Sequence, residues 1–117
     1  MLRDLLIFQK TYDFLLWVKP TVQRFQKMHK YSLGLQLENE TLELLKGIIR
    51  ANNSRNKKAE IIEETFVRYE TVLVLIRLGK DFKVINIKQY EFASANLAEI
   101  GRLLGGWRKK FEQGTDL

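Results

Sequence analysis

Apolar residues recur along the chain at the spacing that amphipathic helices show. In the first segment the recurring positions are Leu5, Phe8, Tyr12, Leu15 and Leu16, and the pattern continues through Val22 and Phe25. It predicts a first helix over about residues 2–28. Pro20 lies inside this helix, where it removes a backbone donor and crowds the preceding turn. We therefore expect a kink or a break near residues 17–18.

Two further helices follow from the same spacing. Ser32 can cap a second helix over about residues 32–52, and Gly79 is a natural C-terminal stop for a third helix over about residues 57–79. The predicted buried stripes are Leu37, Leu42, Leu45, Ile48 and Ile49 in the second helix, and Ile62, Phe66, Tyr69, Leu73 and Ile76 in the third.

A fourth helix is predicted over about residues 87–112. Asn86 and Gln89 have the spacing of a capping box, which opens it. The positions Tyr90, Ala93, Leu97, Ile100, Leu104, Trp107 and Phe111 then alternate in steps of three and four. The glycines at 101, 105 and 106 match no phosphate-binding loop motif, and each costs on the order of 1 kcal/mol inside a helix. We expect them to permit the close approach of a neighbouring helix or of another subunit.

These four helices, joined by short connections, predict an all-α fold: a single up-down-up-down four-helix bundle over residues 1–117. One proline and seven glycines leave few places to end long elements, which disfavours an all-β domain. Polar residues interrupt the apolar N-terminal segment well before the roughly 20 residues that a membrane span needs. We therefore expect no membrane partner. Cysteine is absent and no signal peptide is recognisable, so the cytoplasm is the expected compartment.

The net charge of +6 is concentrated in the first half of the chain. Two windows, residues 14–37 and 44–59, contain no acidic residue. The candidate nucleic-acid contacts in them are Arg24, Lys27 and Lys30 in the first window, and Lys46, Arg50, Arg55, Lys57 and Lys58 in the second. Such windows suit a polyanionic partner, because phosphate neutralisation releases condensed counterions. A solvated face that keeps the protein soluble is the alternative interpretation.

The sequence shows little sign of catalytic or metal chemistry. His29 is the single histidine, so it cannot form a zinc site with cysteines or with a second histidine, and we interpret it as a surface residue. Glu60, Glu63 and Glu64 could share a helix face, but the Glu-x-x-His pairs of di-metal bundles are missing. We expect neither enzymatic activity nor a cofactor.

Two long segments carry a resemblance to a known family. Residues 74–107, VLIRLGKDFKVINIKQYEFASANLAEIGRLLGGW, resemble the signature of the Avd proteins, the accessory variability determinants of diversity-generating retroelements. Residues 24–52, RFQKMHKYSLGLQLENETLELLKGIIRAN, resemble the segment that joins the first two helices of that family. The similarity extends over almost the whole chain, and its most specific part is EIGRLLGGW with IRL upstream.

The resemblance implies a four-helix-bundle protomer of a barrel-like homopentamer. It also implies an accessory protein that associates with the retroelement's reverse transcriptase and with its template-repeat RNA or an RNA/DNA hybrid, in support of mutagenic reverse transcription and retrohoming. Arg77 and Arg102 match recurring arginines of the family and are the transferred candidates for contact with nucleic acid or polymerase. The relatives encoded as intervening sequences in ribosomal RNA genes share the bundle. They imply the alternative of a structural homo-oligomeric scaffold that binds a protein partner.

The chain departs from the family pattern at three positions. Gln26 stands where the family usually has the proline of Phe-Pro-Lys, so the break there is expected to move toward Pro20 or to vanish. Leu73 and Gln36 occupy places where the family often has arginines. In addition, one bundle core cannot use every apolar position, so we expect a protomer interface built from outward residues. The candidates are Leu35, Leu44, Val74 and Leu103.

Overall fold

The computed structural model describes residues 5–112, and these form a bundle of long helices. The long helices are α1 (Leu6–Gln23), α3 (Leu35–Asn53), α4 (Lys58–Asp81) and α5 (Ile87–Glu112). A short helix α2 (Lys27–His29) and a π-helical segment η2 (Lys30–Gly34) join α1 to α3. Between residues 5 and 112 there is no β-strand, so the prediction of an all-α fold is confirmed. The predicted start at residue 2 lies outside the described residues.

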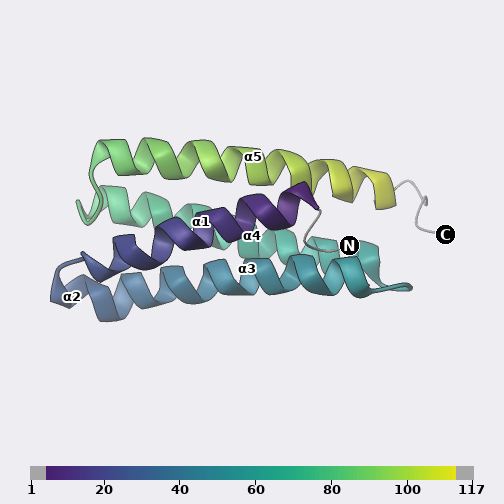
Figure 1. The fold of residues 1–117 in the computed structure, drawn as a ribbon, viewed down its shortest axis with the longest axis horizontal. Coiled ribbons are helices and arrows are strands. Elements are labelled where there is room, and N and C mark those ends of the chain that lie inside the picture. The colour runs from purple at the N-terminus through teal and green to yellow at the C-terminus, as the bar shows by residue number, and fades with distance from the viewer. Residues whose placement is uncertain (1–4, 113–117) are drawn as a thin grey trace.

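Consecutive long helices run in opposite directions, as the up-down-up-down prediction requires (Figure 1). Both α1 and α4 pack against α3 and α5, which places α1 and α4 on one diagonal of the bundle. The molecule measures 48 × 22 × 20 Å. The α1–α3 and α4–α5 connections lie together at one end of this rod, and the α3–α4 connection lies at the other end (Figure 1).

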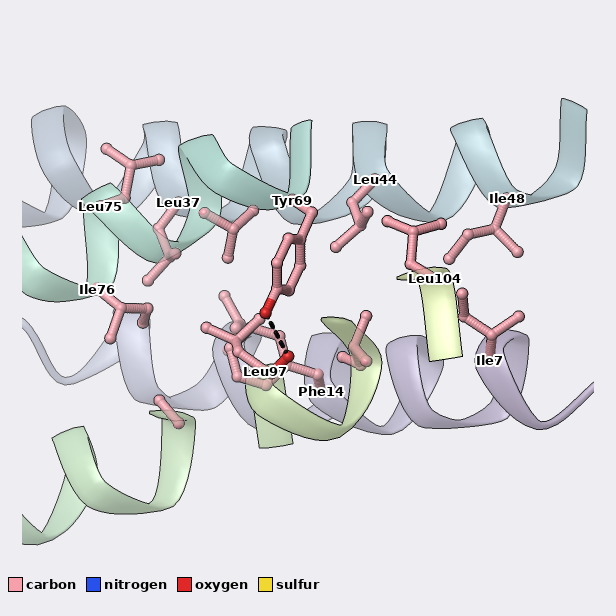
Figure 2. Packing of buried hydrophobic residues seen from close by; sticks show 14 of the residues in the cluster. Ile7, Phe14, Leu37, Leu44, Ile48, Tyr69, Leu75, Ile76, Leu97 and Leu104 are labelled. Atoms are coloured by element: carbon pink, nitrogen blue, oxygen red, sulfur yellow. Dashed lines mark hydrogen bonds between the residues drawn. The ribbon is translucent and has the colours of Figure 1, made fainter. Parts of the chain in front are cut away.

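The core stripe of α5 agrees with the sequence prediction. Ala93, Leu97, Ile100 and Leu104 are fully buried, and Phe111 is nearly so. The two remaining members, Tyr90 and Trp107, are half-buried and pack against this core. Figure 2 shows Leu97 and Leu104 facing the side chains of the other helices. The capping box also forms, because Asn86 and Gln89 each accept a 2.8 Å hydrogen bond from the other's backbone N–H.

The buried stripe of α1 differs from the predicted one. Ile7, Thr11, Phe14 and Val18 face the core, whereas the predicted Leu16 is 56% exposed. Thr11 can be buried because its hydroxyl donates a 2.8 Å hydrogen bond to the carbonyl of the residue four positions earlier. The helical period was therefore right, and the predicted Val22 and Phe25 are buried. The predicted Tyr12 and Leu16 belong instead to a second, outer apolar row of this helix.

The stripes of α3 and α4 are confirmed except at single positions. The predicted core residues that are buried are Leu37, Leu45 and Ile48 in α3, and Ile62, Tyr69 and Ile76 in α4. In α3, Thr41 and Leu44 are fully buried while Leu42 is exposed, so Leu44 does not belong to an outward surface as predicted. In α4, Thr65 and Val72 take core positions, and Leu73 lies at the surface. Of the other residues predicted to face outward, Leu35 and Val74 are exposed, and Leu103 is half-buried.

The helical path differs from the sequence predictions at three places: no break occurs at Pro20, the break of the α1–α3 connection does not move, and Ser32 is not a cap. Helix α1 runs through Pro20 without a break and ends at Gln23, because the chain turns there to bury Phe25. The break thus stays at residues 24–26 although Gln26 replaces the family's proline. Ser32 lies inside the helical segment, where its hydroxyl donates to the Met28 carbonyl, and it caps nothing.

Helix α4 also extends beyond its predicted end. Gly79 is a buried helical residue, and α4 continues to Asp81. The turn that follows depends on Lys83, whose φ of 60° is left-handed. The Gly79 carbonyl accepts hydrogen bonds from the N–H groups of Val84 and Ile85, which closes this turn.

One glycine of α5 has the packing role that the sequence suggested. A Cβ at Gly101 would collide with the hydroxyl of Tyr69 on α4. That hydroxyl donates a 2.8 Å hydrogen bond to the Leu97 carbonyl across the helix interface (Figure 2). Gly105 has only one side-chain atom, of Phe66, at 4.0 Å from such a Cβ, and Gly106 has none within 4 Å. Close approach within the described chain therefore explains Gly101 and not the other two.

Candidate nucleic-acid interface

Two basic segments that are far apart in sequence meet at one end of the bundle. Arg24, Lys27 and Lys30 lie in the α1–α3 connection, and Lys80, Lys83 and Lys88 lie around the α4–α5 connection. Figure 1 shows both connections at the same end. The two connections also approach closely, since a Cβ at Gly79 would lie 3.9 Å from Leu33 Cδ2 of η2. We call these six cations together the basic end.

The basic end has a strong excess of positive charge. The segments around it, residues 24–34 and 77–90, contain its six cations, a seventh in Arg77, and one acidic residue, Asp81. Asp81 is itself shared between Arg77 and Lys80, each at an N–O distance of 3.8 Å. Exposed ion pairs of this length are weak and are screened by salt. The local field therefore remains positive and favours a polyanionic ligand.

Exposed aromatic rings stand among these cations. Tyr31 is 67% exposed and Phe82 is 66% exposed. The Lys30 Nζ lies 5.7 Å from the centroid of the Tyr31 ring. Cations that follow a phosphate backbone, together with rings on which bases stack, are the usual components of single-strand nucleic-acid sites. The basic end can thus supply both parts of such a site.

The second acid-free window lies at the opposite end of the rod. Arg55 and Lys57 are exposed in the α3–α4 connection. About 26 helical residues separate this connection from Lys27, which corresponds to roughly 40 Å at 1.5 Å per residue. The predicted cations therefore do not form one continuous basic face.

Two candidates in this second window, Lys46 and Lys58, are engaged in structural contacts. Lys58 donates 3.0 Å hydrogen bonds to the carbonyls of residues 51 and 52, so it caps the C-terminal end of α3. Lys46 pairs with Glu43 at 3.0 Å, and this hydrogen bond holds the pKa of Glu43 below its usual value. Arg50 lines a shallow hollow with Glu64 and Arg68.

The two arginines transferred from the family do not lie together. Arg77 is exposed near the end of α4, within the segments that surround the basic end. Arg102 lies 15 residues into α5 from its start at Ile87, which is roughly 22 Å away along the helix. The Arg102 guanidinium forms a two-pronged pair with Glu99 at 3.1 and 2.7 Å. This pair lowers the pKa of Glu99 and raises that of Arg102.

Sequence reasoning missed Lys80, Lys83, Lys88 and Phe82. Asp81 interrupts their segment, so no acid-free window marks it, and the second half of the chain is neutral as a whole. A usable signal was nevertheless present. In an up-down-up-down bundle the first and third connections lie at the same end, which brings Lys27 and Lys83 together.

Two further sequence expectations can be compared with the structure. His29, predicted to be a surface residue, is half-buried in α2. Across residues 5–112, no helix has the length and apolar character that a membrane crossing requires.

Comparison with known proteins supports the resemblance that the sequence motifs suggested. A family model described as bAvd-like matches residues 5–111. The match spans nearly all of the described bundle, including both connections of the basic end. No curated protein matches the chain.

Proposed function

The chain belongs to the bAvd-like family, and on this premise we propose that it is the noncatalytic accessory protein of a diversity-generating retroelement. In this role it binds the element's reverse transcriptase and its template-repeat RNA, or the RNA/DNA hybrid made from it. It thereby supports mutagenic reverse transcription and retrohoming. The observation that carries the proposal is the family match over residues 5–111 in a bundle with a concentrated basic end.

The basic end is the part of the chain that we assign to RNA. Its lysines lie in and next to the two connections that carry the exposed Tyr31 and Phe82 rings, so they can contact the phosphates of a strand whose bases stack on these rings. Phosphate contacts make binding depend steeply on salt, with a slope of about −0.7 per contact for single strands. Stacking adds affinity that does not depend strongly on salt or on base identity.

Two charge-matched variants test this assignment. The first replaces Lys27, Lys30 and Lys83 with glutamate, and the second replaces Arg50, Arg55 and Lys57 at the opposite end. Each variant removes three cations and adds three anions, so a nonspecific charge effect would weaken both equally. We expect the first to lose affinity for template-repeat RNA by about tenfold or more, with a salt slope smaller by about 2. Equal losses in the two variants, or a flat salt response of the unmodified protein, would overturn the assignment.

Association with the reverse transcriptase requires a separate assay. We propose a pull-down of the purified protein with its cognate reverse transcriptase, with and without template-repeat RNA, at two salt concentrations. Retention that needs RNA and falls with salt would place the RNA between the two proteins. Retention without RNA would indicate a direct protein contact. No retention in either condition would refute the retroelement role.

Apolar residues on the outer faces of the bundle support assembly of the protomers. Leu16 on α1, and Val67 and Val74 on α4, are each more than half exposed, and patches of exposed apolar side chains commonly mark interaction surfaces. We propose a barrel-like homopentamer, as the family resemblance implies. Light scattering tests it, because a monomer mass of 13.8 kDa in solution would exclude any stable oligomer.

The same exposed apolar faces favour the second candidate function, a structural oligomeric scaffold that binds a protein partner. Such a scaffold would assemble but would show no salt-dependent affinity for RNA. The RNA titration of the unmodified protein therefore separates the two candidates.

A further inference from the structure

A groove on the outside of the bundle lies between α1 and α3. It encloses about 330 Å³, and its lining is mostly apolar. The residues that line it include Tyr12, Leu15 and Leu16 from α1 and Glu38, Asn39 and Leu42 from α3. Tyr12, Leu16 and Leu42 are each at least 42% exposed, so the groove leaves large apolar side chains in water. Such a surface is stabilised when another apolar element covers it.

The groove also contains a polar atom that lacks a partner. The Oε1 of Glu38 is buried from solvent and accepts no hydrogen bond from the described residues. Lys19 lines the same groove, but no hydrogen bond or ion pair joins it to Glu38. Leaving a buried carboxylate oxygen without a donor costs free energy, and a cationic donor gives the strongest hydrogen bond. A suitable occupant is therefore an apolar helix that carries a lysine or an arginine.

The chain itself presents such a helix on another face. Val67, Thr71, Val74 and Leu78 follow one another on α4 in steps of four, three and four. Val67 is 61% exposed and Val74 is 57% exposed, so this row faces away from the core stripe of α4. Apolar residues at this spacing commonly form the face through which a helix packs against a partner helix. We call these four residues the outer row of α4.

A cation lies beside this row. Arg77 immediately precedes Leu78, and its side chain is 76% exposed. Its partner Asp81, at an N–O distance of 3.8 Å, is also exposed, and such a pair contributes little to stability. The guanidinium can therefore turn toward the Glu38 Oε1 of a neighbouring copy at small cost.

We propose that the outer row of α4 in one copy docks into the α1–α3 groove of a second copy, where Arg77 donates hydrogen bonds to Glu38. The apolar row covers Tyr12, Leu16 and Leu42, and the guanidinium supplies the donor that Oε1 lacks. The second copy is favoured over a foreign helix because this chain offers both complementary surfaces. The proposal rests on the proposed homo-oligomer and names the contact that forms it.

The two surfaces lie on different faces of the bundle, because α4 is diagonal to α1. The contact is therefore heterologous: each copy uses its groove toward one neighbour and its outer row toward the other. A heterologous contact closes into a ring when its rotation allows, and otherwise continues as a filament. A symmetric two-fold contact would instead use the same surface on both copies.

A mixing experiment uses this asymmetry. Leu16→Glu places a charge in the groove and leaves the outer row intact, whereas Val74→Glu does the reverse. Both positions are exposed, so the variants should fold, and circular dichroism checks their helix content. By light scattering we expect each variant alone to have the 13.8 kDa monomer mass. An equimolar mixture should form a two-chain species, in which the intact groove of one variant holds the intact outer row of the other.

Charge reversal tests the proposed ion pair. Glu38→Arg and Arg77→Glu should each abolish assembly, and the double variant should restore it because the pair is then inverted. The proposed contact would be overturned if either single variant assembled like the unmodified protein. It would also be overturned if the mixture of the groove and row variants stayed monomeric.

If the unmodified protein is an oligomer and one of these results is found, the homo-oligomer stands and only this contact fails. A monomeric unmodified protein would overturn both.

Discussion

Gly101→Ala tests how tightly α4 and α5 pack at the centre of the bundle. The methyl group would collide with the Tyr69 hydroxyl and would lie 2.6 Å from its Cζ. Tyr69 must then move, which breaks its 2.8 Å hydrogen bond to the Leu97 carbonyl. The phenol is buried deeply enough to raise its pKa, so its hydroxyl does not readily find water in place of that carbonyl.

The expected change in the free energy of unfolding has three parts. Leaving a buried hydroxyl without a partner costs about 1–3 kcal/mol. Forcing the ring from its position costs about 1–3 kcal/mol. The higher helix propensity of alanine raises the free energy of unfolding by about 1 kcal/mol. The net prediction is a destabilisation of about 1–5 kcal/mol, measured by urea unfolding at one protein concentration, because assembly would add to the apparent stability.

Gly106→Ala is the matched control on the same helix. A Cβ at this position meets nothing within 4 Å, so only the propensity gain applies, and the variant should be more stable by about 1 kcal/mol. A Tyr69→Phe background removes the nearest colliding atom, and Gly101→Ala should cost less there than in the unmodified protein. If Gly101→Ala proved as stable as Gly106→Ala, the reasoning about this contact would be refuted.

Three other substitutions probe single contacts. Lys58→Ala should lower the free energy of unfolding by about 1 kcal/mol, because it removes the cap of α3, while Lys57→Ala should change it little in the same thermal unfolding assay. Gln26→Pro should raise it by about 0.4–1 kcal/mol, since the φ of −57° suits proline and the position precedes a helix; a loss in the same assay would contradict this. Arg102→Met should raise the lowered pKa of Glu99 toward its usual value in an NMR titration. The stability from that pair is fully present above the usual glutamate pKa and is lost as the pH falls through the lowered one.

The number of apolar rows on a helix explains why some buried stripes were easier to predict than others. In α5 the apolar residues form one row, so the heptad spacing identified the buried face correctly. In α1 and α4 they form two rows, and spacing alone does not say which row is buried. Threonines such as Thr11 and Thr65 count as polar in a sequence pattern. Each nevertheless lies in the core, because its hydroxyl donates a hydrogen bond to a backbone carbonyl of its own helix.

The sequence by itself determined the helical class, the capping box at Asn86, the core row of α5 and the family to which the chain belongs. These features are local or periodic, so they depend on residues within a few turns of one another. Only the tertiary structure decided that Thr11 and Phe14 of α1 face the core while Leu16 does not, that the basic segments around Lys27 and Lys83 meet, and that the Glu38 oxygen lacks a partner. Each of these depends on contacts between helices, because a side chain is buried only where another helix covers it, and the sequence of one segment does not say which of its faces is covered.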